Sequence, residues 1–272
     1  MNQAGGKRSK KRALYPLFIG AVLIVMYIPI ILVIVYSFNQ SRLTSVWGGF
    51  TLAWYAELFR DRAMFEGLRN SLVLAVLASS LAAALGTLGA SGTARVRALT
   101  GFSGGIHRGM EFLSILPIMM PEIIMGIIFL AFFSLLSLPS GMLTLVIAHT
   151  AFCAPYPYLL VRARLSGIDK SYVEAARIMG AGELRAFYDV TLPLMLPAVL
   201  SGMLISFAMS FDDVIVSSFV AGVNTNTLPL IIYSRLRTGV TPAVNAMCTL
   251  LFVLTIILCL SAAWLAMRGK KE

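Results

Sequence analysis

Six long apolar blocks alternate with shorter polar connections along the chain. The blocks cover residues 14–38, 71–92, 111–136, 142–161, 194–220 and 242–267. Because an α-helix rises about 1.5 Å per residue, each block is long enough to cross a hydrocarbon core about 30 Å thick. With 58% hydrophobic and 12% charged residues, the chain has more apolar surface than one soluble core could bury. The pattern predicts an all-α, polytopic membrane protein with six transmembrane helices in a single domain over residues 1–272.

The basic residues are distributed unequally between two sets of connections. The two termini, residues 93–110 and residues 162–193 carry 16 of the 22 Lys and Arg residues, whereas residues 39–70 and 221–241 carry six. Because basic residues gather on the cytoplasmic side, both termini and residues 162–193 are predicted to be cytoplasmic. The net charge of +10 therefore reflects topology and not nucleic-acid binding. The first block is too long for a signal-peptide core, so it is interpreted as an uncleaved span.

The other connections carry no catalytic motif. Residues 98–109 are rich in glycine but lack the Gly-Lys-Ser/Thr of a phosphate-binding loop, so they predict a flexible basic loop. Aromatic residues within residues 39–70 predict a short helix, lying either in the membrane interface or against the helix bundle. The three cysteines lie inside apolar blocks without disulfide or metal-ligand spacing. We therefore predict no catalytic residue and no metal site.

Residues 162–193 form a polar segment between the fourth and fifth apolar blocks. Ser171 and Glu174 fit a capping box, in which the serine hydroxyl caps a helix and the glutamate reaches back. Gly180 is a natural helix stop, and residues 183–190 predict a second short helix that ends before Pro193. The segment is therefore expected to form a helix, a tight turn and a helix on the cytoplasmic surface.

Three carboxylates lie inside apolar blocks, namely Glu122, Asp212 and Asp213. An aspartate at the centre of a membrane helix costs about 2.5 to 3.5 kcal/mol, whereas each Leu, Ile or Phe returns about 0.3 to 0.6 kcal/mol. The aspartate pair therefore offsets roughly a dozen apolar residues, so these acids should face a pathway, a partner or an interface. Glu122 follows Pro121, where a functional kink and a local structural role both remain open.

Helical spacing separates the two aspartates. Ser206, Ser210, Asp213 and Ser217 recur at spacings of four, three and four, which places them on one helix face. Asp212 points away from that face. We predict that Asp213 lines a polar translocation path with Ser210 and Ser217, and that Asp212 pairs with another helix or subunit. The alternative is that the serine stripe is a helix-packing seam.

The spacing within residues 162–193 resembles the cytoplasmic loop signature of ABC importer permeases. That signature is Glu-Ala-Ala, three residues, Gly, nine residues, an aliphatic residue, one residue and Leu-Pro. The matching residues are Glu174, Ala175, Ala176, Gly180, Val190, Leu192 and Pro193. The family often has isoleucine at the position of Val190.

This resemblance implies a type I ABC importer permease fold whose loop docks into a dimer of cytoplasmic ATPase subunits. Ala175, Ala176 and Gly180 would allow close backbone approach, and Glu174 would meet basic groups of the partner. The resemblance also implies that the partner ATPase binds ATP and Mg²⁺. This chain would then be a transport subunit with no cofactor and no enzymatic activity.

Further motifs resemble the spermidine/putrescine importer permeases, in particular the second of their two paired permease subunits. They are Tyr36–Asn39, Trp54–Tyr55, Ala148–Cys153, Ser210–Val214, Ser217–Val220, Thr227–Leu230, Ile232–Ser234 and Gly239–Ala246. The resemblance implies polyamine import across the bacterial inner membrane, with a second permease and a periplasmic solute-binding protein. A path for such cations needs carboxylates and aromatic faces, so Tyr156 and Tyr158 join Asp213, Asp212 and Glu122 as candidates.

Other functions remain open at this point. The same importer could carry another organic cation, an amino-acid-like compound or ferric iron. An ion-gradient carrier would also place acids in the membrane, but it does not explain the cytoplasmic loop. An intramembrane protease needs two acids that converge on one water, whereas Asp212 and Asp213 diverge on a helix.

Overall fold

The computed structural model describes the chain except for residues 1–4, 43–45, 101–104 and 269–272. The described residues are mainly helical, and their extended pairing is limited to one isolated bridge between Asn39 and Phe50. The predicted all-α class is therefore confirmed. The chain divides into two compact units, which are residues 1–62 with 234–272, and residues 63–233.

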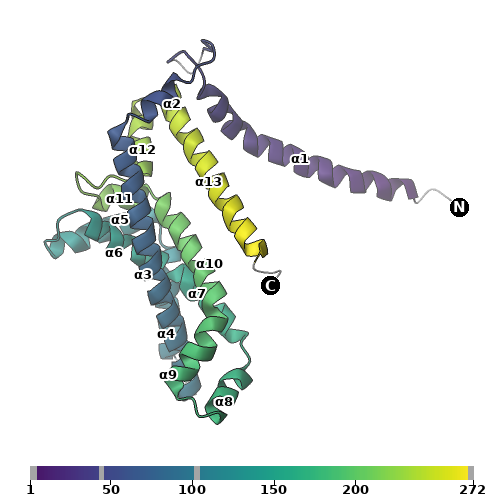
Figure 1. Cartoon of the computed structure of the whole chain (residues 1–272), viewed down its shortest axis with the longest axis vertical. Helices are drawn as coiled ribbons and strands as arrows, with labels where there is room; N and C mark the ends of the chain where they lie inside the picture. Colours follow the sequence, from purple (N-terminus) through teal and green to yellow (C-terminus); the bar gives the residue numbers. More distant parts are fainter. Residues whose placement is uncertain (1–4, 43–45, 101–104, 269–272) are drawn as a thin grey trace. The chain divides into compact units, whose positions relative to one another are not determined.

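Among its described residues, the first unit contains three complete helices, namely α1 (Gly5–Tyr36), α2 (Ala53–Leu58) and α13 (Pro242–Arg268) (Figure 1). α13 packs against both α1 and α2. α2 is the short helix predicted within residues 39–70, and Leu58 is buried in it, which favours packing over an interfacial position. Asp61, which follows α2, pairs with Arg235 at 2.6 Å. The apolar side chains of α1 are largely exposed, as expected for a helix in contact with lipid or a partner.

The second unit holds the remaining helices, and α12 extends from it into the first unit. These are α3 (Arg62–Thr100), α4 (Gly105–Met119), α5 (Glu122–Leu135), α6 (Met142–Cys153), α7 (Pro155–Ser166), α8 (Lys170–Ile178), α9 (Glu183–Ala186), the π-helix η1 (Phe187–Thr191), α10 (Leu192–Phe211), α11 (Ile215–Val220) and α12 (Leu228–Thr238). α10 packs along α7, and α11 packs on α5. A Cβ atom on Gly202 of α10 would lie 2.5 Å from the Cα atom of Pro157. Only glycine allows this approach of α10 to α7.

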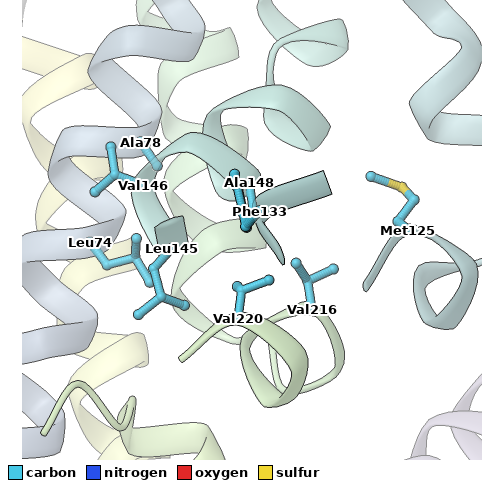
Figure 2. Close-up of a cluster of buried hydrophobic side chains, with 9 residues drawn as sticks. All are labelled: Leu74, Ala78, Met125, Phe133, Leu145, Val146, Ala148, Val216 and Val220. Carbon is cyan, nitrogen blue, oxygen red and sulfur yellow. The ribbon is translucent and has the colours of Figure 1, made fainter. Parts of the chain in front are cut away.

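A buried hydrophobic cluster joins α3, α5, α6 and α11 (Figure 2). Its members are Leu74, Ala78, Met125, Phe133, Leu145, Val146, Ala148, Val216 and Val220. α11 is only six residues long, so its own hydrogen bonds cannot hold it in place. Burial of Val216 and Val220 in this cluster therefore fixes α11 against its neighbours.

Within the part of the chain that the structure describes, four helical stretches are long and apolar enough to cross a membrane: Phe18–Tyr36, Arg62–Arg95, Met142–Ser166 and Glu183–Phe211. α4 and α5 meet the same criterion as a pair that is bent by 107°. α13 is apolar over the shorter stretch Pro242–Ile257. Each of the six predicted blocks thus coincides with a helix or a helix pair, so the six-span count holds approximately.

The predicted loop at residues 98–109 is wrong over most of its length. α3 continues to Thr100 and α4 begins at Gly105; the residues between them lie outside the described part of the chain. Alanine, arginine and leucine favour helix, and a glycine in a helix costs only about 1 kcal/mol relative to alanine. The helix propensity of the alanine, arginine and leucine residues therefore outweighs the cost of the scattered glycines.

Candidate functional site

Two membrane spans of the second unit are broken next to polar residues. α4 ends at Met119, and α5 begins at Glu122 after Pro121. Proline has no N–H and disfavours helical backbone at the preceding residue, so the chain turns there. α10 ends at Phe211, and α11 begins at Ile215. The break at Pro121 agrees with the kink that the sequence left open there, whereas the fifth block was treated as one continuous helix, and that interpretation is wrong.

Asp213 accounts for the second break. Its Oδ1 accepts a hydrogen bond from the N–H of Val216 at 3.2 Å, and its Oδ2 accepts one from the N–H of Ser217 at 2.8 Å. The carboxylate thereby satisfies N–H groups that are free at the start of α11. Unsatisfied N–H groups are costly in a bilayer. Asp213 therefore stabilises the start of α11 independently of any role in the cavity.

The two breaks lie at one cavity of about 350 Å³. Its walls include three acids, Glu122, Asp212 and Asp213, together with Tyr156. The other lining residues are mainly apolar: Pro117, Ile118, Met120, Met125, Phe152, Met209, Val214, Ile215 and Val216. An apolar cavity with a few convergent polar groups is the usual form of a small-molecule site. Acids that are distant in the sequence are thus brought together in space.

The relation between the two aspartates differs from the prediction. On one continuous helix they would face different directions, but the break after Phe211 allows both to line the cavity. The side chain of Asp213 is only 5% exposed, whereas Asp212 is exposed. Asp213 is therefore the fixed acid of the cavity, and Asp212 is the accessible one.

The three serines near the aspartates are absent from the cavity lining. Ser206, Ser210 and Ser217 are buried. The hydroxyl of Ser206 donates to the carbonyl of Cys153 at 3.2 Å, and the other two hydroxyls contact His149. The serines therefore connect α10 and α11 to α6, as the alternative of a packing seam predicts.

The two candidate tyrosines have different surroundings. Tyr156 lines the cavity. Tyr158 is buried in a hydrophobic cluster with Ala90, Val161 and Met195. Within the described residues its hydroxyl has no hydrogen-bond partner. Tyr158 therefore does not lie with the acids as predicted.

His149 contacts Asp213 although it was not among the residues predicted for the site. It is fully buried in α6, and its Nε2 lies 3.5 Å from Oδ2 of Asp213. Its position inside an apolar block was a usable signal, since ionisable residues in membrane helices are costly and usually functional. Its partners could not be predicted, because they come from other helices.

The polar segment between α7 and α10 begins with a capped helix. The N-cap of α8 is Asp169, whose side chain accepts a hydrogen bond from the N–H of Ser171 at 2.9 Å. The predicted capping box of Ser171 and Glu174 is therefore wrong, because Ser171 is already inside α8. A carboxylate at this position also interacts favourably with the positive end of the helix dipole.

Gly180 terminates α8, as predicted. Its φ angle is +87°, in the left-handed region that glycine adopts without strain. The N–H of Gly180 donates to the carbonyl of Arg177 at 2.9 Å, and the N–H of Ala181 donates to the carbonyl of Ala176 at 3.0 Å. These two bonds form a Schellman motif. The turn after α8 therefore has a defined shape.

The chain beyond this turn departs from the prediction. α9 covers only Glu183–Ala186, and η1 connects it to α10, so that one helical stretch runs over Glu183–Phe211. Pro193 lies in the first turn of α10 and does not interrupt this stretch. In a π-helix each carbonyl bonds to the N–H five residues later. In this register the N–H of Leu192, the residue before Pro193, donates to the carbonyl of Phe187.

The residues of the predicted loop signature divide between the surface and the interior. The exposed members are Glu174, Ala175, Gly180 and Pro193. Ala176 is buried, and Leu192 packs against the cluster around Tyr158. Beside the exposed members, Ile178 and Met179 are 88% and 82% exposed. Large apolar side chains at the tip of a polar segment are typical of a protein-binding surface.

Ion pairs connect this segment to the helices that lead into the membrane. Glu183 of α9 pairs with Arg95 of α3, and also with Arg177 of α8 at 3.2 Å. Glu111 of α4 pairs with Arg162 of α7 at 2.5 Å. Exposed pairs contribute at most about 1 kcal/mol each. Their effect here is to orient α8 and α9 against α3.

Replacing Asp169 should loosen α8 more than replacing Ser171. The backbone and hydroxyl of Ser171 hydrogen-bond to the carboxylate and hold the pKa of Asp169 below its usual range. This contribution is present at neutral pH and is lost as the pH falls through the lowered pKa. Hydrogen exchange of the α8 amides should therefore be faster in Asp169→Ala and nearly unchanged in Ser171→Ala. Equal exchange in both variants would contradict the assigned cap.

Two relatives match nearly the whole chain. The putrescine transport system permease protein PotI of Escherichia coli (strain K12) is 37% identical over 253 residues, which cover 91% of this chain and 88% of the relative. The spermidine/putrescine transport system permease protein PotC of the same organism is 38% identical over 252 residues, which cover 92% of each. Both comparisons span the broken helices and the polar segment between α7 and α10.

The fold is also similar to that of a solved transporter. A chain from the crystal structure of a bacterial ABC transporter involved in the import of the acidic polysaccharide alginate superposes with a TM-score of 0.74 at 17% identity, covering 97% of this chain and 99% of that chain. At this identity the likeness concerns the fold alone. A family model, Binding-protein-dependent transport system inner membrane component, matches residues 98–268. The chain therefore belongs to the family of inner-membrane components of binding-protein-dependent transport systems.

Proposed function

We propose that this chain is one of two permease subunits of an ATP-driven importer, and that its cargo is a polyamine such as spermidine or putrescine. The observation that supports this cargo best is the cavity at which Glu122, Asp212 and Asp213 come together. The relatives with 37% and 38% identity carry polyamine transport in their names. The chain is a multi-pass inner-membrane protein of a transport system. The identity of the cargo is what we propose in addition.

The cavity has the chemistry that an organic polycation requires. A polyamine carries several ammonium groups separated by methylene chains, so it needs anionic groups at intervals and apolar walls between them. Glu122 and Asp212 are exposed, and Tyr156 adds an aromatic face on which an ammonium group can rest. The apolar residues between the acids suit the methylene chain. Partial replacement of the hydration shell by these groups lets a cation pass without being held tightly.

The energy for transport would enter through α8. Its exposed residues Glu174 and Ala175 and the apolar pair Ile178 and Met179 would dock into a cytoplasmic ATPase dimer. That dimer would bind ATP and Mg²⁺ and carry out hydrolysis. α8 is joined through Glu183 to α3, so movement of the ATPase would reach the membrane helices as a rigid-body displacement.

The remaining partners follow from the same proposal. A second, homologous permease subunit would complete the translocation path. A periplasmic solute-binding protein would deliver the cargo, as the description of the family implies. Both termini and residues 162–193 would lie in the cytoplasm.

The cargo is tested by direct binding to the solute-binding protein that acts with this permease. Calorimetric titrations with putrescine and spermidine should give heats that saturate. Butanediol and succinate serve as matched controls, because they keep the carbon spacing of putrescine but are neutral or anionic. Binding of succinate or butanediol in preference to the amines would overturn the polyamine assignment and leave the importer role intact.

The topology is tested with single cysteines at two highly exposed positions. Val223, in the connection between α11 and α12, is 92% exposed, and Met179 after α8 is 82% exposed. A membrane-impermeant maleimide added to spheroplasts should label Val223→Cys and spare Met179→Cys until the membrane is opened. Labelling of the unsubstituted chain, which contains three cysteines, is subtracted as background. The reverse pattern would place the termini in the periplasm.

A further inference from the structure

A buried polar cluster lies next to the cavity and shares only Asp213 with the lining that the proposed function uses. It consists of His149, Ser210, Ser217 and Asp213, and we call it the His149 cluster. The imidazole is fully buried. Its Nδ1 lies 2.8 Å from the hydroxyl of Ser210, and its Nε2 lies 3.1 Å from the hydroxyl of Ser217. Both ring nitrogens are therefore engaged.

The two hydroxyls belong to different helices on either side of the break. Ser210 is in the last turn of α10, whereas Ser217 is in the first turn of α11. His149 comes from α6 and so joins the two halves of the broken span. The ring also packs on Phe152, a residue of the cavity wall, with a centroid distance of 5.0 Å. A residue of α6 therefore holds together α10 and α11, the two helices on either side of the break.

Asp213 depends on this arrangement for its position. Its Oδ2 accepts the N–H of Ser217, the residue whose hydroxyl contacts His149. The same Oδ2 lies 3.5 Å from Nε2 of His149. If the imidazole is removed, the first turn of α11 loses a side-chain anchor, and the carboxylate loses its nearest ring nitrogen. Asp213 would keep its bonds to the N–H groups of Val216 and Ser217, but its carboxylate could shift together with the first turn of α11.

We propose that His149 is a positioning residue that holds the carboxylate of Asp213 at the cavity wall, where it meets an ammonium group of the cargo. This role rests on the proposed function of the cavity. Recognition of a charged group requires its partner to be fixed within about 0.5 Å, and such precision comes from the residues behind the contacting one. His149 supplies that support from a third helix.

A purely structural role for His149 makes a different prediction. As a polar packing contact between helices, it would affect transport independently of the charge on Asp213. If it acts through Asp213, its removal should matter only while the carboxylate is present. A double-mutant cycle separates the two cases, because residues acting as a unit give non-additive losses.

The test uses the complete importer, reconstituted in proteoliposomes with the loaded binding protein, and measures the initial rate of polyamine uptake. We expect His149→Ala to lower the rate about ten-fold. In the Asp213→Asn background the same change should cause little further loss. The Asp212→Asn background is the matched control. There, the fold-loss in uptake rate caused by His149→Ala should multiply the fold-loss caused by Asp212→Asn alone. Losses that multiply equally in both backgrounds would overturn the proposal.

If the His149→Ala permease does not assemble with its partners, Ser210→Ala and Ser217→Ala replace it in the double-mutant cycle. Each removes one hydroxyl contact and leaves the ring in place. Each should lower uptake partially, and the Asp213→Asn background should again abolish the effect. Persistence of the effect in that background would contradict the role of the cluster. If the unsubstituted importer takes up no polyamine, the cargo assignment fails, and the cycle is run with the solute that the binding protein carries.

Discussion

An importer carrying Gly180→Val should insert into the membrane normally but lose most of its coupled transport. Gly180 has a φ angle of +87°, and no neighbouring atom lies within 4 Å of a Cβ built at this position. A side chain there would strain the backbone without clashing with other atoms. For a branched residue that strain is about 1 to 3 kcal/mol. Relief of the strain would break the two hydrogen bonds of the turn and move Ile178 and Met179 from their places.

The expected result is a loss of uptake of roughly ten-fold or more, together with loss of ATPase stimulation by the loaded binding protein. Gly182→Val is the matched control. Gly182 lies in the same turn and also has open space around it, but its φ angle is −66°, which valine adopts readily. This variant should transport nearly normally. Equal losses in both variants would attribute the effect to side-chain bulk and not to the turn.

Glu174→Gln tests the same surface without altering the backbone. Glu174 is exposed, so loss of its charge should leave α8 folded. We expect weaker docking of the ATPase, measured by its co-purification with the permease pair. Normal stimulated ATPase activity in both Gly180→Val and Glu174→Gln would contradict the assignment of α8 as the docking helix.

Asp213→Asn should impair polyamine uptake strongly without unfolding the second unit. Asparagine keeps one side-chain oxygen that can accept an N–H at the start of α11 and is itself a good N-cap. The substitution therefore removes the charge while retaining much of the structural contribution of Asp213. A lost charge contact of this kind corresponds to roughly ten-fold or more in rate. Initial uptake rates at equal amounts of assembled importer measure the effect.

The other acids of the cavity sharpen this prediction. Asp212→Asn should also lower uptake, because Asp212 is exposed and lines the same cavity. Glu66→Gln is the matched control, since Glu66 is an exposed acid of α3 that does not line the cavity. Uptake should be unchanged in this control. Equal and mild effects of all three changes would argue against an acidic cargo path.

Asp213 also shows how one residue can combine two roles. Its cost in an apolar span is offset because the carboxylate accepts two N–H groups that would otherwise be unsatisfied. The energetic cost of membrane insertion predicted that the acid has a structural or functional role. It could not distinguish capping of a helix from contact with the cargo. The geometry contains both, because the carboxylate that caps α11 is also part of the cavity wall.

The sequence by itself determined those features that depend on composition and local backbone preference. Apolar blocks define membrane spans because lipid solvates about twenty apolar residues regardless of what surrounds them. Gly180 stops α8 because only a residue without Cβ adopts its φ angle freely. Local preference was less reliable where several residues compete, since Asp169 and not Ser171 caps α8.

The tertiary structure decided how distant residues meet. Hydropathy does not distinguish a straight span from one broken at Pro121 or after Phe211, because both halves of a broken span are still apolar. It therefore could not predict that Glu122 and Asp213 share one cavity, or that Tyr158 lies elsewhere. The contact of His149 with α10 and α11 likewise depends on the packing of three helices. Such contacts arise from non-local packing, which leaves no periodic signal in the sequence.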